Sequence, residues 1–279
     1  MEEFCAMNDK ISLAGDLGSG KSTVAAILIE KLGAEYYSTG AIVRSIAAKR
    51  NMSVVELNVY METHPEIDHE IDDGLKALSD LDKPLVIDSR MAWHFTRGTF
   101  KVYLSTDTEV SALRIMGANR QGEHKASLED TIKDTRARRA SEKKRYLEQY
   151  GVDIKDLSNY SLIVDTTYAT PDEVAECILK SFEAWQKDNS FTAAYISPER
   201  INYPDEEADA EKLSTLTTDL EFGKALPEVL VFECDGEFYL EGGYESALAY
   251  SLAMSTYVPV RLVTGDSTGK TYVKMKNSL

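Results

Sequence analysis

The first 188 residues alternate between two patterns of hydrophobic and polar positions. Short apolar runs occur over 11–14, 35–37, 84–88, 101–104 and 161–165. Each run is followed by segments in which apolar residues recur every three or four positions, the period of a helix with one buried face. Strands that alternate with helices in this way favour an α/β fold. We therefore predict a parallel sheet of five strands with helices on both faces.

Residues typical of helix ends support these boundaries. Ser53 and Glu56 have the spacing of a capping box, and the helix predicted over 127–150 begins with a second box and stops at Gly151. A helix over about 66–79 carries a run of acids, which we expect to form a solvated face because charge runs on helices usually do. These acids are Glu66, Asp68, Glu70, Asp72 and Asp73.

Between the first strand and the first helix, residues 15–22 (GDLGSGKS) match the phosphate-binding pattern G-x-x-x-x-G-K-[ST]. The glycines let backbone N–H groups turn toward a triphosphate, Lys21 reaches its β- and γ-phosphates, and the Ser22 hydroxyl binds Mg²⁺. This order also directs a helix N-terminus at an anion. We therefore predict a triphosphate site with Mg²⁺ as cofactor and Ser22 as metal ligand. Its binding residues are Gly15, Gly18, Ser19, Gly20, Lys21, Ser22 and Thr23.

Two further groups of polar residues stand where a ligand of this sheet would lie. Asp88 ends the strand over 84–88 and Arg90 comes two residues later, and ligands of parallel sheets bind at the carboxyl ends of strands. The helix over 127–150 is crowded with cations. It is either a solvated face balanced by acids of the same helix, or a lid that closes over phosphates. The cations are Arg136, Arg138, Arg139, Lys143, Lys144 and Arg145.

The composition narrows the classes of partner and compartment. A net charge of −16 disfavours a surface for duplex nucleic acid or for an anionic membrane, since both attract cationic proteins. The three cysteines are far apart and show no metal or disulfide spacing. The acidic N-terminus is unlike a secretory signal, and the longest apolar run is too short to span a bilayer. We therefore expect a cytoplasmic protein without a membrane partner.

Residues 189–279 have a different texture and are predicted to form a small, acidic α+β domain. An acidic stretch over 204–209 precedes two apolar runs, 228–234 and 237–240, which flank Asp235 and Gly236 and read as a hairpin. A helix around 247–253 and a strand over 258–263 follow. This order is similar to the ParB and sulfiredoxin-like fold. That fold places His and Arg after a glycine, where this chain has residues 243–246 (GYES), so we expect a domain that self-associates or binds a protein partner.

Several ordered motifs of residues 9–185 resemble the archaeal-type cytidylate kinases and their cytidylate-kinase-like relatives, which are nucleoside monophosphate kinases. They are residues 14–23 (AGDLGSGKST), 37–40 (YSTG) with Arg44, 88–90 (DSR), 141–146 (SEKKRY) and 150–154 (YGVDI). The resemblance implies a P-loop NTPase fold over residues 1–188, a monophosphate-binding flap after the second strand and an arginine-rich lid after the fourth. It also implies transfer of the γ-phosphoryl of ATP to CMP or dCMP.

The same resemblance implies roles for individual residues. The acceptor nucleotide would lie against Ser38, Gly40, Arg44 and Arg90, with both arginines on its phosphate. Asp88 would bind the acceptor or organise water around the metal, two roles that the sequence leaves open. The catalytic set would be Lys21, Asp88 and the lid arginines Arg120, Arg136 and Arg138, which would neutralise the moving phosphoryl group. Two other functions stay open: a P-loop kinase of another small metabolite, and an ATP-binding regulatory module with little turnover.

Overall fold

The structure is a computed structural model that describes residues 9–117 and 127–274. The described residues form two compact units: those up to residue 162 group with 171–192, and 163–170 group with those from residue 193 onward. The sequence places a boundary at residue 189, close to the start of the second continuous stretch. It does not anticipate that residues 163–170 group with the C-terminal part. No helix among the described residues is long and apolar enough to cross a membrane.

The first unit contains four parallel strands in the order β4-β1-β3-β2. They are β1 (Lys10–Gly15), β2 (Glu35–Ser38), β3 (Leu85–Asp88) and β4 (Thr99–Ser105). The fifth predicted strand is observed as β5 (Leu162–Asp165), at the division between the units. The predicted parallel α/β architecture is therefore confirmed. All four strands of the first unit end at one edge, where their last residues can form a common site.

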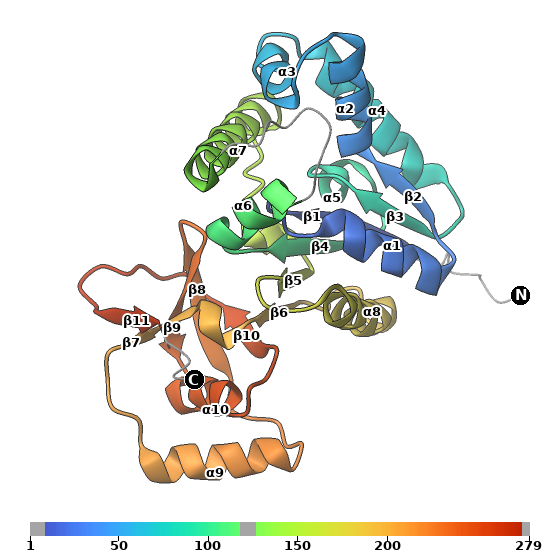
Figure 1. The fold of residues 1–279 in the computed structure, drawn as a ribbon. Coiled ribbons are helices and arrows are strands. Elements are labelled where there is room, and N and C mark those ends of the chain that lie inside the picture. Colours follow the sequence, from blue (N-terminus) through green and yellow to red (C-terminus); the bar gives the residue numbers. More distant parts are fainter. Residues whose placement is uncertain (1–8, 118–126, 275–279) are drawn as a thin grey trace, which may run out of the picture. The chain divides into compact units, whose positions relative to one another are not determined.

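Eight helices of the first unit connect and cover these strands in the described residues (Figure 1). They are α1 (Lys21–Leu32), α2 (Thr39–Lys49), α3 (Val54–Met61), α4 (Glu66–Ala77), α5 (Ala92–Phe95), α6 (Thr108–Gly117), α7 (Leu128–Tyr150) and α8 (Pro171–Lys187), with short 3₁₀ turns at Leu78–Asp80 and Leu157–Asn159. The capping boxes predicted from Ser53 and Ser127 are both formed. Gly151 ends α7 in the left-handed conformation, as its position predicted.

The sheet is covered on both faces, because successive strand residues point to opposite sides. Ile87 of β3 packs with Leu75 of α4 and Ala92 of α5 on one face. Phe100 of β4 has the opposite orientation and packs against Trp185 of α8 in a tilted arrangement, at 5.5 Å between ring centroids. This packing fixes the strand ends from both sides.

The prediction of a solvated acidic face on α4 is wrong for two of its five acids. Asp68 and Asp72 are each only 4% exposed, whereas Glu66, Glu70 and Asp73 are exposed. Burial of these two carboxylates is possible because α7 supplies partners: Arg145 Nε lies 2.9 Å from Asp68, and Tyr150 donates a hydrogen bond to Asp72. A charge run does not reveal such partners when they lie about 80 residues further along the chain.

The second unit holds a mixed sheet in the order β11-β7-β9-β8-β10-β6. Its elements are β6 (Ala193–Ile196), a 3₁₀ turn (Pro198–Arg200), β7 (Ile201–Pro204), α9 (Ala210–Glu221), β8 (Val229–Cys234), β9 (Glu237–Gly242), α10 (Tyr244–Leu252), β10 (Val258–Leu262) and β11 (Tyr272–Lys274). The predicted hairpin is confirmed: β8 and β9 are antiparallel, and Asp235 and Gly236 both have positive φ. The helix and strand predicted after it are also present, whereas the likeness to the ParB and sulfiredoxin-like fold stays a prediction.

Candidate active site

The loop between β1 and α1 has a backbone conformation that requires glycine. Gly15 has φ +139°, and a Cβ placed there would lie 2.3 Å from the carbonyl oxygen of Leu104 in β4. Gly18 and Gly20 are left-handed, with φ +73° and +80°. Gly20 is the N-cap of α1, and Ser22 and Thr23 are exposed in the first turn. The loop therefore turns closely against β4 and leads into a helix N-terminus, the geometry that suits an anion.

Lys21 folds back over this loop. Its Nζ donates to the carbonyl oxygens of Gly15 and Asp16, at 3.1 and 2.6 Å, and contacts Ser19 Oγ at 3.2 Å. Burial, together with the positive charge of Arg90, lowers the pKa of Lys21 to about 8. A cation held among carbonyl dipoles and close to an arginine is prepared to gain an anionic ligand, which would raise this pKa again.

The ends of β2 and β3 bring the predicted acceptor residues to the same edge. Ser38 is paired in register with Asp88, and Asp88 with Leu13 of β1, two residues before Gly15. The Tyr36 hydroxyl donates to Asp88 Oδ2 at 3.1 Å. Asp88 therefore lies beside the start of the phosphate loop, as its position after an apolar strand predicted.

Ser38 and Gly40 begin α2 next to this edge. The Ser38 hydroxyl caps the helix by accepting from Ala41 N, at 3.3 Å. A Cβ at Gly40 would lie 3.4 Å from Arg44 Nη1, so the small residue leaves room for that guanidinium. Arg44 itself is exposed. The structure thus groups Ser38, Gly40 and Arg44 at one helix start.

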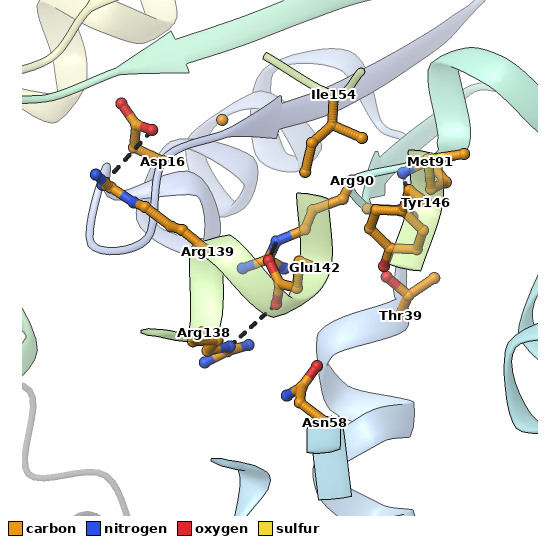
Figure 2. Close-up of polar contacts among 12 residues, drawn as sticks. Asp16, Thr39, Asn58, Arg90, Met91, Arg138, Arg139, Glu142, Tyr146 and Ile154 are labelled. Atoms are coloured by element: carbon orange, nitrogen blue, oxygen red, sulfur yellow. Dashed lines mark hydrogen bonds and ion pairs between the residues drawn. The ribbon is translucent and has the colours of Figure 1, made fainter. Parts of the chain in front are cut away.

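Glu142 of α7 joins two of the predicted arginines (Figure 2). Its Oε2 lies 2.5 Å from Arg90 Nε, and its Oε1 lies 3.1 Å from Arg138 Nε. Glu142 is only 4% exposed. Burial would raise the pKa of Glu142, but the two guanidiniums outweigh it and hold that pKa below its usual value. The carboxylate is therefore an internal anion between an arginine from the end of β3 and one from α7.

Asp16, inside the phosphate loop, is the centre of a second buried network. Its carboxylate accepts from the Tyr103 hydroxyl at 3.0 Å and from Thr106 N at 3.1 Å. Lys155 Nζ and Arg139 Nη2 lie 2.5 and 3.5 Å from Oδ1. Burial would raise the pKa of Asp16, but Lys155 and Arg139 lower it to about 2. The loop is thus tied to β4, to α7 and to the segment after α7.

Two cavities open beside these networks. One, of about 170 Å³, is bordered by the phosphate loop, Tyr103, Arg139, Lys155 and Tyr160. The other admits about 30 Å³ and lies among residues of α2, α3, α4 and α7. Arg90 and Glu142 line both cavities. The ion pair between them therefore separates the space next to the phosphate loop from the space on the side of α2 to α4.

The remaining lid arginines are placed differently. Arg138 is on the inner side of α7 with its side chain 19% exposed, whereas Arg136 is exposed. Arg120 lies outside the described residues. Trp93, three residues after Arg90, is 7% exposed and packs in the core, where its Nε1 donates to the carbonyl of Arg90 at 2.8 Å.

Sequence reasoning missed the buried acids that hold these cations. Glu142 entered only as a charge that balances the cations of this helix, in the interpretation of the helix as a solvated face. A signal was present, because the buried residues Thr131, Thr135, Glu142 and Arg145 of α7 recur at helical spacing. These buried residues are polar or charged, so a search for apolar residues at helical spacing does not detect them.

The oxygen donors at the strand ends fit a magnesium ion that is bound together with phosphates. The Ser22 hydroxyl is exposed at the start of α1, and the Asp88 carboxylate stands at the end of β3. Hydroxyl and carboxylate oxygens are ligands that Mg²⁺ prefers, and Mg²⁺ usually completes its shell with phosphate oxygens and water. Within residues 9–117 and 127–274, no three His, Cys, Asp or Glu side chains gather as a metal site. The described protein groups therefore fit a metal that arrives with a nucleotide.

Comparison with known proteins adds an independent observation. The profile of the cytidylate kinase-like family matches residues 10–168. The chain is 35% identical over 187 residues to a cytidylate kinase of Thermoplasma volcanium, covering 66% of this chain and 96% of that protein. It is 38% identical over 175 residues to a cytidylate kinase of Archaeoglobus fulgidus, covering 62% and 94%. The solved structure of a shikimate kinase from Acinetobacter baumannii aligns over 63% of this chain and 93% of its own, with a TM-score of 0.42 and 19% identity.

Proposed function

This chain belongs to the cytidylate kinase-like family, and we propose that it is a nucleoside monophosphate kinase that transfers the γ-phosphoryl group of ATP to CMP or dCMP. The relatives named cytidylate kinase are matched over nearly their whole length, and their match leaves about a third of this chain over. The family model matches residues 10–168, which supports our proposal that the phosphotransferase activity belongs to the N-terminal part of the chain.

One observation carries the proposal: the cation of the phosphate loop and the arginine of the acceptor side lie within electrostatic reach of each other. Arg90 lines the same cavity as Gly15 and Asp16, whose carbonyl oxygens hold the Lys21 amine. Burial, and next the charge of Arg90, lower the pKa of Lys21 to about 8, whereas the nearby acids oppose this shift. Phosphoryl transfer depends mainly on positioning and charge stabilisation. Cations that converge from β3 and from the phosphate loop supply both, provided that two phosphates meet between them.

On the donor side, the proposal assigns the triphosphate to the phosphate loop. Backbone N–H groups of the loop over 15–20 would hold the phosphate oxygens, with Ser19 and Thr23 as further polar contacts. Lys21 would exchange its carbonyl partners for the β- and γ-phosphates. Ser22 would hold Mg²⁺, which would supply positive charge that offsets the negative charge of the phosphates.

On the acceptor side, the monophosphate would bind Arg90 and Arg44, whose planar guanidiniums suit two phosphate oxygens at once. Ser38 and Gly40 would contact the nucleotide next to them. Asp88 would orient the acceptor or the water shell of the metal. The lid arginines Arg120, Arg136 and Arg138 would stabilise charge on the moving phosphoryl group, and an arginine in that role contributes about a thousandfold or more in rate.

The experiment is an acceptor panel. The protein is incubated with ATP and Mg²⁺ and with CMP, dCMP, UMP or AMP in turn, and ADP formation is measured. We expect ADP to form fastest with CMP or dCMP. Absence of acceptor-dependent ADP with every monophosphate would refute the proposal. Turnover with a non-nucleotide alcohol would then favour the metabolite kinase, and ATP binding without turnover the regulatory module.

Two variants separate the donor and acceptor roles. Lys21→Ala should abolish ADP formation, whereas Lys31→Ala, an exposed lysine in the last turn of the same helix, should leave it unchanged. Arg44→Ala should raise the KM for CMP more than it lowers kcat, because it removes a contact to bound acceptor. Lys49→Ala, exposed at the end of α2, is the matched control.

The rest of the proposal concerns partners, compartment and the C-terminal part. We propose a cytoplasmic enzyme. Its net charge of −16 supports the further proposal that it binds neither duplex nucleic acid nor an anionic membrane. The second unit is proposed to self-associate or to bind a protein partner. Light scattering of the full chain alone tests self-association. Light scattering after addition of proteins that the chain captures tests partner binding, and neither measurement depends on activity.

A further inference from the structure

We propose that Glu142 is a positioning residue for the acceptor phosphate, which holds Arg90 by its Nε so that the opposite end of the guanidinium receives the phosphoryl group. The inference rests on the proposed kinase function and adds a residue to which that function assigns no role. It makes Glu142 part of the acceptor site without contact to the substrate.

The atoms that form the ion pair carry the inference. Glu142 contacts Arg90 through Nε, at 2.5 Å. A guanidinium has three nitrogens in one plane, so a partner on Nε leaves the edge formed by Nη1 and Nη2 outside that ion pair. This edge is the one that binds two oxygens of a phosphate in parallel. A carboxylate on Nε therefore orients the arginine while it leaves its phosphate-binding end to another ligand.

Burial makes this orientation strong. The Glu142 side chain is 5% exposed and that of Arg90 17% exposed, so water screens their attraction little. The second oxygen of Glu142 is held by Arg138, which fixes the carboxylate plane from the other side (Figure 2). Arg90 is thus held by a group that is itself held, as positioning of a reactive contact requires.

The location of the pair also favours positioning over a purely structural role. Arg90 and Glu142 are largely buried, yet both line the two cavities of the site, where a ligand would enter. Arg90 comes two residues after β3 and Glu142 from the middle of α7, so the pair connects the acceptor side to the lid helix. A substitution at Glu142 should therefore weaken binding of the acceptor phosphate more than binding elsewhere in the site.

The test compares Glu142→Gln with Glu148→Gln. Glu148 is exposed on the same helix, so its substitution is the same chemical change outside the network. We expect Glu142→Gln to lower kcat/KM for CMP about 100-fold, because small misplacements of reacting groups cost that much. Binding of CMP, measured by calorimetry, should weaken at least tenfold, on the order of one pKd unit, while ATP binding stays within about threefold. Glu148→Gln should match the wild type.

A double-mutant cycle shows whether Glu142 acts through Arg90. In an Arg90→Lys background, which has no planar fork, Glu142→Gln should lower kcat/KM less than about threefold further. Full additivity of the two losses would overturn the inference. So would equal weakening of CMP and ATP binding, since a damaged fold affects both.

Two further outcomes are tested with a shorter acidic side chain at position 142 and with the wild-type protein. If Glu142→Gln does not fold, Glu142→Asp keeps the charge but is one methylene shorter; unchanged CMP affinity in that variant would overturn the inference. If the wild type phosphorylates no monophosphate, the proposed function fails, but the positioning role of Glu142 can still be tested with inorganic phosphate. Inorganic phosphate should then stabilise the wild type against heating more than it stabilises Glu142→Gln, and equal stabilisation would refute the role.

Discussion

Gly15→Ala is the substitution for which the structure gives the most definite expectation. The residue ends β1 and stands in register opposite Leu104 of β4. Its φ of +139° is open to glycine and strained for alanine, and the new methyl carbon would lie 2.3, 2.7 and 2.9 Å from the O, N and C atoms of Leu104. Since these are backbone atoms of a neighbouring strand, the overlap can be relieved only by moving the strands apart. We therefore expect a large loss of stability.

The size of this loss follows from two contributions. A residue held in a conformation that its side chain disfavours costs about 1–3 kcal/mol, and overpacking against fixed neighbours costs about 1–3 kcal/mol more. The hydrogen bond from Asp16 N to the Leu104 carbonyl, at 2.9 Å, is also at risk. Together these give a loss of about 2–6 kcal/mol, a large part of the stability of an ordinary domain.

Gly33→Ala is the matched control, because Gly33 also has positive φ (+61°) but no atom within 4 Å of the added Cβ. We expect it to cost only about 1–2 kcal/mol, the preference of an L-residue against the left-handed region. Urea unfolding followed by tryptophan fluorescence measures both variants in the first unit, which holds both tryptophans, Trp93 and Trp185. Equal midpoints for the two variants would refute the reasoning from strand contact.

Three further predictions concern buried charges. The folded-state pKa of Asp16 is about 2, against an ordinary 3.8. The ionised carboxylate therefore contributes about 2 kcal/mol of stability above about pH 4, and this contribution is lost as the pH falls toward 2. The urea midpoint of Asp16→Asn should not show this acid-dependent decrease. Burial raises the pKa of Asp72 to about 6, although a hydrogen bond from Tyr150 opposes the shift. Ionisation then weakens the fold as the pH rises from about 4 to 6, so Asp72→Asn should gain stability relative to the wild type, by at most about 3 kcal/mol, between pH 4 and pH 7; an unchanged difference would contradict this. Arg145→Met should cost about 3–5 kcal/mol in urea unfolding because it leaves the Asp68 carboxylate buried without its ion pair, and Asp68→Asn in that background should recover part of the loss.

The sequence predicted the parts of this molecule that depend on local pattern. The strand ends, the glycine loop, the two capping boxes and the hairpin at Asp235 each follow from residues within a few positions of one another. The grouping of Asp88 and Arg90 beside the phosphate loop also followed, because the carboxyl ends of parallel strands share one edge.

What it did not predict depends on contacts across the chain. The Asp68 carboxylate is buried because Arg145, 77 positions later, supplies its partner, and Asp16 because Lys155 and Arg139 do. The pattern of polar residues on α4 and α7 is the same whether the charges face water or one another. Only the tertiary packing decides between these cases, so the solvated face was the wrong choice for Asp68 and Asp72.

The contacts of the cationic helix α7 bear on both of its interpretations, the solvated face and the lid over phosphates. Arg139 lies against the phosphate-loop acid Asp16, Arg145 against Asp68 of α4, and the acid Glu142 against Arg90 beyond β3. One helix is therefore tied by charge to the phosphate loop, to α4 and to the arginine that follows β3. Phosphate groups that enter this space add negative charge next to cations already balanced by these carboxylates. Binding of phosphate groups beside the phosphate loop or beside Arg90 must therefore change the electrostatic balance of α7.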